Sequence, residues 1–175
     1  MNNQVESMAA LMTHGITAMV VHQNSEILAS LKNALERQGM SVLQADSRAR
    51  AIQMPGGQNP APLVFTDTEL PDGTWADILA EAERAAQPVN VIVVARVVDT
   101  RFYLKTIETG AFDFIAPPFV ATDLEYVVRS ALDNVAARRG VRARNGGTGT
   151  DRRLWTVTKK PVLRCLMGVK IQSDQ

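Results

Sequence analysis

The chain has 175 residues, of which 46% are hydrophobic and 21% charged, so it can form one domain with a sizeable core plus extensions. Its single cysteine, Cys165, excludes an internal disulfide and a cysteine metal cluster. No apolar run reaches the roughly 20 residues of a membrane helix, and residues 1–14 lack the basic and apolar regions of a signal peptide. These features predict a cytoplasmic protein with no membrane association.

The net charge of +1 conceals two oppositely charged parts of the chain. Residues 138–175 hold 10 Lys and Arg residues against 2 Asp and Glu residues, whereas the other 137 residues hold 9 against 16. An acidic body of net charge −7 is therefore followed by a basic tail of net charge +8. Such a tail can bind nucleic acid, an anionic membrane surface or the acidic body itself, or it can be a disordered extension.

Short apolar runs alternate with helical patterns along the chain. Apolar and β-branched runs predict strands at residues 17–21, 41–44, 63–66, 89–95 and 112–116. Apolar residues at helical spacing predict a helix after each strand, and these five helices end near Gly39, Met54, Pro88, Gly110 and Arg138. The candidate N-terminal caps are Asn24 or Ser25, Thr74, Asp99 or Thr100, and Thr122.

Alternation of strands and helices predicts parallel pairing, right-handed crossovers and helices on both faces of one sheet. We therefore expect an α/β, flavodoxin-like, doubly wound fold of five strands in the order 2-1-3-4-5, with five helices. Its binding site would lie where the order reverses, at the carboxyl ends of strands one and three. We expect a disordered N-terminus over residues 1–15, one domain over 16–138, and a flexible basic tail over 139–175.

The most informative segment is residues 63–73, LVFTDTELPDG, in which an apolar run ends at the carboxylate of Asp67. That carboxylate would lie at the end of a buried strand, and Pro71 to Gly73 would form the turn after it. The segment strongly resembles the phosphoacceptor segment of the response-regulator receiver domains (CheY-like domains) of two-component signalling. The resemblance covers about residues 17–138. It implies that Asp67 is the phosphoacceptor, that a histidine kinase or another signalling protein is the partner, and that the protein is not an enzyme.

Four positions depart from the chemistry that this resemblance implies. The acidic pair that holds Mg²⁺ after the first strand is replaced by His22 and Gln23, although Mg²⁺ prefers oxygen ligands and imidazole suits softer metals. A hydroxyl at the end of the fourth strand is replaced by Ala95, and a lysine after the fifth by Pro117. Only Asp67 is retained, so we expect no resident cofactor and at best a weak Mg²⁺ site at Asp67.

Two further features follow from the same alignment. Phe114 matches the aromatic switch residue of receivers, but Ala95 lacks the hydroxyl that partners it, so we expect Phe114 to act in packing. The cis peptide bond of the family would fall between Pro117 and Pro118.

Two interpretations of the site are open at this point. In one, Asp67 is phosphorylated inefficiently by a partner kinase; in the other, the chain is a degenerate, stand-alone pseudo-receiver that binds a partner without phosphorylation. His22 adds a hypothesis of its own, because a neighbouring carboxylate would raise its pKa and make a His22–Asp67 ion pair sensitive to pH.

The resemblance also implies a contact surface, formed by the fourth helix, the fifth strand and the fifth helix, for partner binding and homodimerisation. Helical spacing predicts six exposed side chains there: Arg101, Lys105, Glu108, Asp123, Glu125 and Arg129. The alternative class of function is a nucleic-acid-binding transcriptional regulator that uses the basic tail. Trp155 is the only aromatic residue of that tail, so stacking on bases has little support.

Overall fold

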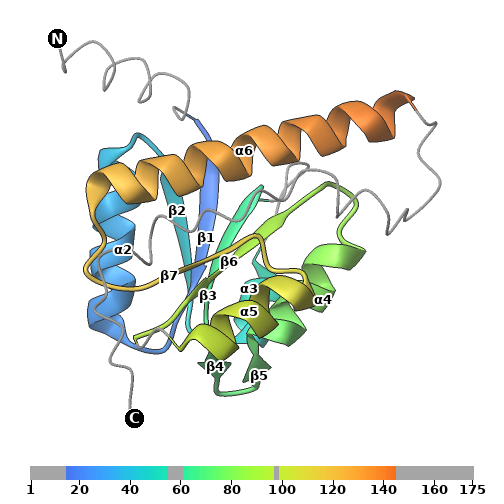
Figure 1. Ribbon diagram of the computed structural model, residues 1–175. Coiled ribbons are helices and arrows are strands. Elements are labelled where there is room, and N and C mark those ends of the chain that lie inside the picture. Colours follow the sequence, from blue (N-terminus) through green and yellow to red (C-terminus); the bar gives the residue numbers. More distant parts are fainter. Residues whose placement is uncertain (1–14, 55–60, 97–98, 145–175) are drawn as a thin grey trace, which may run out of the picture.

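The computed structural model describes residues 15–54, 61–96 and 99–144, which form a parallel five-stranded sheet with helices on both faces (Figure 1). The strands, in sheet order, are β2 (Ser41–Ala45), β1 (Thr17–Val21), β3 (Leu63–Asp67), β6 (Asn90–Val94) and β7 (Asp113–Ile115). This is the predicted order 2-1-3-4-5, and all four neighbouring pairs are parallel. The flavodoxin-like prediction is therefore confirmed.

One helix follows each of these strands in the chain, as predicted: α2 (Ser25–Arg37), α3 (Arg48–Gln53), α4 (Trp75–Arg84), α5 (Thr100–Thr109) and α6 (Ala121–Arg144). One apolar core lies between the sheet and α2 and α6, and includes Phe65, Leu35 and Val127. A second core lies on the opposite face, against α3, α4 and α5, and includes Val93 and Leu79. Because β3 and β6 contribute to both cores, their sequences are continuously apolar instead of alternating.

Local hydrogen bonds explain where several helices begin. The Asn24 side-chain oxygen accepts from two backbone N–H groups of the first turn of α2, and Asp99 accepts from the N–H of Arg101 in α5. Before α4, the Asp77 carboxylate accepts from the N–H of Thr74 at 2.8 Å. The predicted caps Asn24, Thr74 and Asp99 are thus confirmed.

Helix α6 differs from its prediction at both ends. It begins at Ala121, and its first helical hydrogen bond runs from Leu124 N–H to the oxygen of Val120, so the prediction that Thr122 caps it is wrong. It ends at Arg144 instead of near Arg138, because residues 139–144 contain no proline and the single Gly140 does not stop a helix. The helix therefore extends six residues beyond its predicted end.

A buried polar network fixes α6 to the start of β6. The fully buried Asn90 donates through Nδ2 to the backbone oxygen of Ala131 (2.8 Å) and to Oδ1 of Asn134 (3.1 Å). Arg138 donates through Nη1 to Oδ1 of Asn90 (3.0 Å) and to the oxygen of Val89 (3.3 Å). These bonds hold the second half of α6 against the sheet.

Smaller differences concern a hairpin and the termini. A two-stranded hairpin, β4 (Glu69–Leu70) and β5 (Gly73–Thr74), was not predicted and follows β3 directly. The disorder predicted for the N-terminus and most of the basic tail falls on residues 1–14 and 145–175, outside the described part of the chain. Within the described part, no helix is both long enough and apolar enough to cross a bilayer.

Candidate functional site

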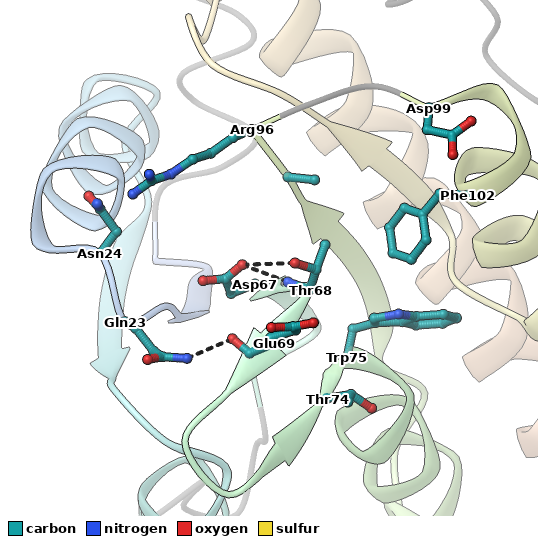
Figure 2. A pocket seen from close by; sticks show the side chains of 11 residues that line it. Gln23, Asn24, Asp67, Thr68, Glu69, Thr74, Trp75, Arg96, Asp99 and Phe102 are labelled. Atoms are coloured by element: carbon teal, nitrogen blue, oxygen red, sulfur yellow. Dashed lines mark hydrogen bonds between the residues drawn. The ribbon is translucent and has the colours of Figure 1, made fainter.

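An open hollow of about 940 Å³ lies at the carboxyl ends of β3 and β6 (Figure 2). Because β3 lies between β1 and β6, side chains from the ends of all three strands meet there. The residues that matter for its chemistry are Gln23, Asn24, Asp67, Thr68, Ala95 and Arg96. The site therefore lies where the reversal of strand order predicted it.

Asp67 is the last residue of β3, and its side chain is 20% exposed. Its Oδ1 accepts from the backbone N–H of Thr68 at 2.7 Å and from the Thr68 hydroxyl at 3.3 Å. Its Oδ2 lies 3.2 Å from Nδ1 of His22. The carboxylate is thus held mainly by its own neighbour in sequence.

His22 follows β1 and is only 3% exposed. Its Nδ1 accepts a hydrogen bond from the N–H of Asn24 at 2.9 Å, so in the neutral imidazole this nitrogen carries no proton to share with Asp67. Burial is the largest influence on His22 and lowers its pKa; Asp67 opposes this and the charge of Arg96 adds to it. The net direction is therefore opposite to the predicted one: burial outweighs the charge of Asp67 and favours the uncharged imidazole.

Gln23 directs its amide nitrogen toward β4, the first strand of the hairpin after β3. Its Nε2 donates to the backbone oxygen of Glu69 at 3.0 Å (Figure 2). At the positions beside Asp67, the Gln23 amide nitrogen and the His22 imidazole do not supply the oxygen ligands that Mg²⁺ prefers. Within the described residues no group of three or more His, Cys, Asp or Glu side chains could hold a metal ion. The residues present do not fit the metal that the resemblance implies.

The structure also places the other three predicted positions. Ala95 directly follows β6 and presents a methyl group to the hollow, while Pro117 follows β7 and is joined to Pro118 by a cis peptide bond. Phe114 is buried in β7, and its ring makes edge-to-face contacts with Phe102 and Tyr103. Phe114 therefore packs in the core.

Arg96 is a residue of the site that sequence reasoning missed. It follows Ala95 at the end of β6, is exposed, and lines the hollow together with Asp67. Figure 2 shows its side chain extending toward Asn24. A cation directly after the most apolar strand was the available signal, because polar residues at that edge of a parallel sheet surround its site.

Comparison with known proteins agrees with this arrangement. The sequence model of the family described as the response regulator receiver domain matches residues 18–129, well over half of the chain. The chain belongs to this receiver family. Members of this family are signalling proteins.

The receiver is similar to parts of larger curated proteins. The DNA-binding transcriptional regulator NtrC of Rhizobium meliloti (strain 1021) is 29% identical over 118 residues, which cover 67% of this chain and 24% of NtrC. The transcriptional regulatory protein PrrA of Mycobacterium bovis (strain ATCC BAA-935 / AF2122/97) is 31% identical over 126 residues, which cover 69% of this chain and 53% of PrrA. The chain thus spans about a quarter to a half of the length of these relatives.

Solved structures give the same family and fold. A response regulator receiver domain protein from Clostridium thermocellum has a TM-score of 0.59 and 26% identity, and the match covers 67% of this chain and 94% of that one. The receiver domain of a signal transduction histidine kinase from Syntrophus aciditrophicus has a TM-score of 0.57 over 69% of this chain and 92% of that one. At 22% identity, the second likeness shows the fold alone.

In this receiver, the turn after Asp67 is tied to a distant helix. The Asp72 carboxylate accepts from the backbone N–H groups of Arg48 and Ala49, both at 2.7 Å, at the start of α3. These bonds, the one from Ala49 first, lower the pKa of Asp72. Arg48 in turn pairs with Glu81 of α4 at 2.9 Å. The hairpin that follows Asp67 is therefore held in a fixed position.

The predicted contact surface is formed by α5, β7 and α6. Of its six named residues, five are exposed as predicted: Arg101, Lys105, Glu108, Asp123 and Arg129. Glu125 is half-buried, contrary to prediction, because it pairs with Arg129 at 2.6 Å along α6. Three large apolar side chains are also exposed on these elements and the loop between them: Leu104, Val120 and Tyr126.

Proposed function

We propose that this receiver signals by binding a partner protein, and that phosphorylation of Asp67 is slow or absent. The observation that carries the proposal is the environment of Asp67. His22 and Gln23 stand beside it in place of an acidic pair that would hold Mg²⁺, Ala95 has no hydroxyl, and Pro117 has no ammonium group. The Gln23 amide instead donates to the backbone oxygen of Glu69 in β4. Asp67 remains the candidate phosphoacceptor because it lies at the end of β3.

The absence of these charge-stabilising groups is large enough in energy to make phosphoryl transfer to Asp67 slow. Bringing a phosphoryl group to a carboxylate joins like charges, so stabilisation of the developing charge is the main requirement. Removing one such donor typically costs about 2–4 kcal/mol of transition-state stabilisation. The losses are not additive, but together they would slow transfer by orders of magnitude.

The contact surface on α5, β7 and α6 supports binding as the mode of action. Leu104, Val120 and Tyr126 are each about half exposed and supply apolar side chains on α5, on α6 and just before α6. Exposed charges, including Arg101 and Asp123, surround them in sequence. Such a surface suits a histidine kinase, another signalling protein or a second copy of this chain, and the proposal places these contacts in the cytoplasm.

The test is phosphorylation by acetyl phosphate, with and without Mg²⁺, followed by intact-mass spectrometry. Asp67→Ala reports on the site, and Asp123→Ala is the control because it removes an exposed carboxylate on α6. We expect no gain, or only a slow gain, of one phosphoryl group in the wild type at any Mg²⁺ concentration. Rapid Mg²⁺-dependent labelling that is lost only in Asp67→Ala would refute the proposal.

A second candidate function is regulation of transcription through nucleic-acid binding. NtrC and PrrA are transcriptional regulators by name, and the basic tail of this chain begins within α6, at Arg138 and Arg139. Contacts between arginines and phosphates would make binding to duplex DNA fall steeply with salt. Binding measured by fluorescence anisotropy at several salt concentrations, with and without residues 145–175, tests this function. Equal and weak binding by both forms would exclude it.

A further inference from the structure

A groove of about 400 Å³ lies between α6 and the amino ends of β1 and β3, at the opposite end of these strands from the candidate site. Ile16 and Pro62, which directly precede β1 and β3, line it together with Val128, Leu132 and Ala136 of α6. Figure 1 shows α6 crossing the sheet beside the start of β1. Ile16 and Leu132 are only partly buried and Ala136 is exposed, so the groove presents apolar surface to the outside.

The N-terminal segment, residues 1–14, carries an apolar stripe that matches such a groove. Val5, Met8 and Met12 follow one another at spacings of three and four residues, so they would share one face of a helix. Methionine has an unbranched, flexible side chain that fills irregular apolar spaces. The opposite face of this helix would carry polar side chains: Asn3, Ser7 and His14.

Gly15 joins the N-terminal segment directly to the groove. It has a φ of 86° and immediately precedes Ile16 of the groove wall. A glycine in this left-handed region commonly follows the last residue of a helix. Three residues separate Met12 from Ile16, so the chain itself holds the apolar stripe at the groove at a high effective concentration.

The basic tail is a poorer match for the same groove. It continues from the end of α6 at Arg144, and residues 145–153, NGGTGTDRR, offer no apolar side chain. The polar rim of the groove has two acidic and two basic side chains, which together give a basic segment no net attraction: Glu125, Arg129, Asp133 and Arg139. A rim without net charge suits the N-terminal segment, in which Glu6 is the only Asp, Glu, Lys or Arg residue.

We propose that the N-terminal segment forms an amphipathic helix that docks in this groove, with its apolar stripe against Leu132 and Ala136. A helix of this length is only marginally stable alone in water, so its order depends on the contact with α6. The docked helix borders the contact surface on α5, β7 and α6, because Glu125 and Arg129 belong to both. The inference replaces the disorder predicted for the N-terminus and does not rest on the proposed function.

The experiment is hydrogen–deuterium exchange of the full chain, read by mass spectrometry of peptides from the N-terminal segment. We expect exchange at least about tenfold slower than in an unstructured peptide, as for a docked state favoured by about ten to one. Met8→Asp in the apolar stripe and Ala136→Lys in the groove should abolish this protection. The matched controls should retain it: Ser7→Asp on the polar face, and Ala137→Lys at an exposed neighbour that does not line the groove.

Four results would overturn the inference. The first is the absence of protection in the wild type. The second is protection lost in Met8→Asp but kept in Ala136→Lys, because the segment would then lie against another surface. Protection that falls on dilution would assign the groove to a second copy of the chain, and protection of residues 154–171 that Ala136→Lys removes would assign it to the tail. Both alanines are exposed and lysine favours helix, so the lysine variants should fold, which circular dichroism verifies.

Discussion

Replacement of the buried Asp113 by asparagine should stabilise the fold at neutral pH. Asp113 is the first residue of β7, opposite Ile92, and is 3% exposed. Its Oδ1 accepts from the N–H of Phe114 at 2.8 Å, whereas Oδ2 has no hydrogen-bond partner within the described part of the chain. Burial raises the pKa of Asp113 from its ordinary value of 3.8 to about 6, against a smaller lowering by the Phe114 N–H.

The sign and size of the effect follow from this shift. Because the folded state holds the proton more tightly than the unfolded state, this group destabilises the fold as the pH rises from 3.8 toward 6. Once the pH is well above both pKa values, ionisation of Asp113 has lowered the free energy of unfolding by about 3 kcal/mol, at about 1.4 kcal/mol for each unit of pKa difference. Between pH 4.5 and 7.5 the loss is about 2 kcal/mol, because the unfolded carboxyl is already largely ionised at pH 4.5.

Urea unfolding of both proteins across that pH range, monitored by circular dichroism, measures the effect. The free energy of unfolding of Asp113→Asn, relative to wild type, should rise by about 2 kcal/mol from pH 4.5 to 7.5. The control Asp123→Asn changes an exposed carboxylate of α6 and should run parallel to wild type. Parallel curves for Asp113→Asn as well would refute the reasoning, because they would mean that Asp113 is not protonated preferentially in the fold.

Three other substitutions test separate parts of the structure. Asn24→Ala removes the cap of α2 and should lower the free energy of unfolding by about 1 kcal/mol, whereas Asn24→Asp should retain most of it. Leu35→Ala opens a cavity in the core beneath α2 and should lower the free energy of unfolding by about 2–5 kcal/mol. As a control, Ile52→Ala changes an exposed position and should alter the free energy of unfolding by less than about 0.5 kcal/mol. Asp72→Ala should speed hydrogen exchange at the first amides of α3, and unchanged exchange there would contradict its capping role.

The parts of the fold that could be predicted from the sequence are those decided locally. An apolar run such as that of β6 identifies a strand buried on both faces, and Asn24 and Asp99 identify helix starts because a cap bonds to residues two or three positions away. The position of Asp67 followed for the same reason, since it ends one such run. The alternation of strands and helices then predicted parallel pairing, and the strand order was expected to be the flavodoxin-like one.

The details that the sequence could not predict depend on contacts between distant segments. Asp72 caps a helix that begins 24 residues earlier, and Gln23 bonds to a carbonyl 46 residues away. The pKa of His22 could not be predicted because its direction depends on burial, which outweighs the charge of Asp67. Arg96 was missed because its place beside Asp67 depends on the pairing of β6 with β3 in the folded sheet.

Asn90 and Arg138 hold α6 in one orientation relative to the sheet, so the end of this helix points in a fixed direction. Its 24 residues make a rod of about 36 Å, and the bonds to β6 fix the rotation of that rod about its own axis. Insertion of one alanine after Gly140 would lengthen the rod by about 1.5 Å and turn its far end by about 100°. The number of residues between Arg138 and Arg144 therefore sets the direction in which the last residue of α6 faces.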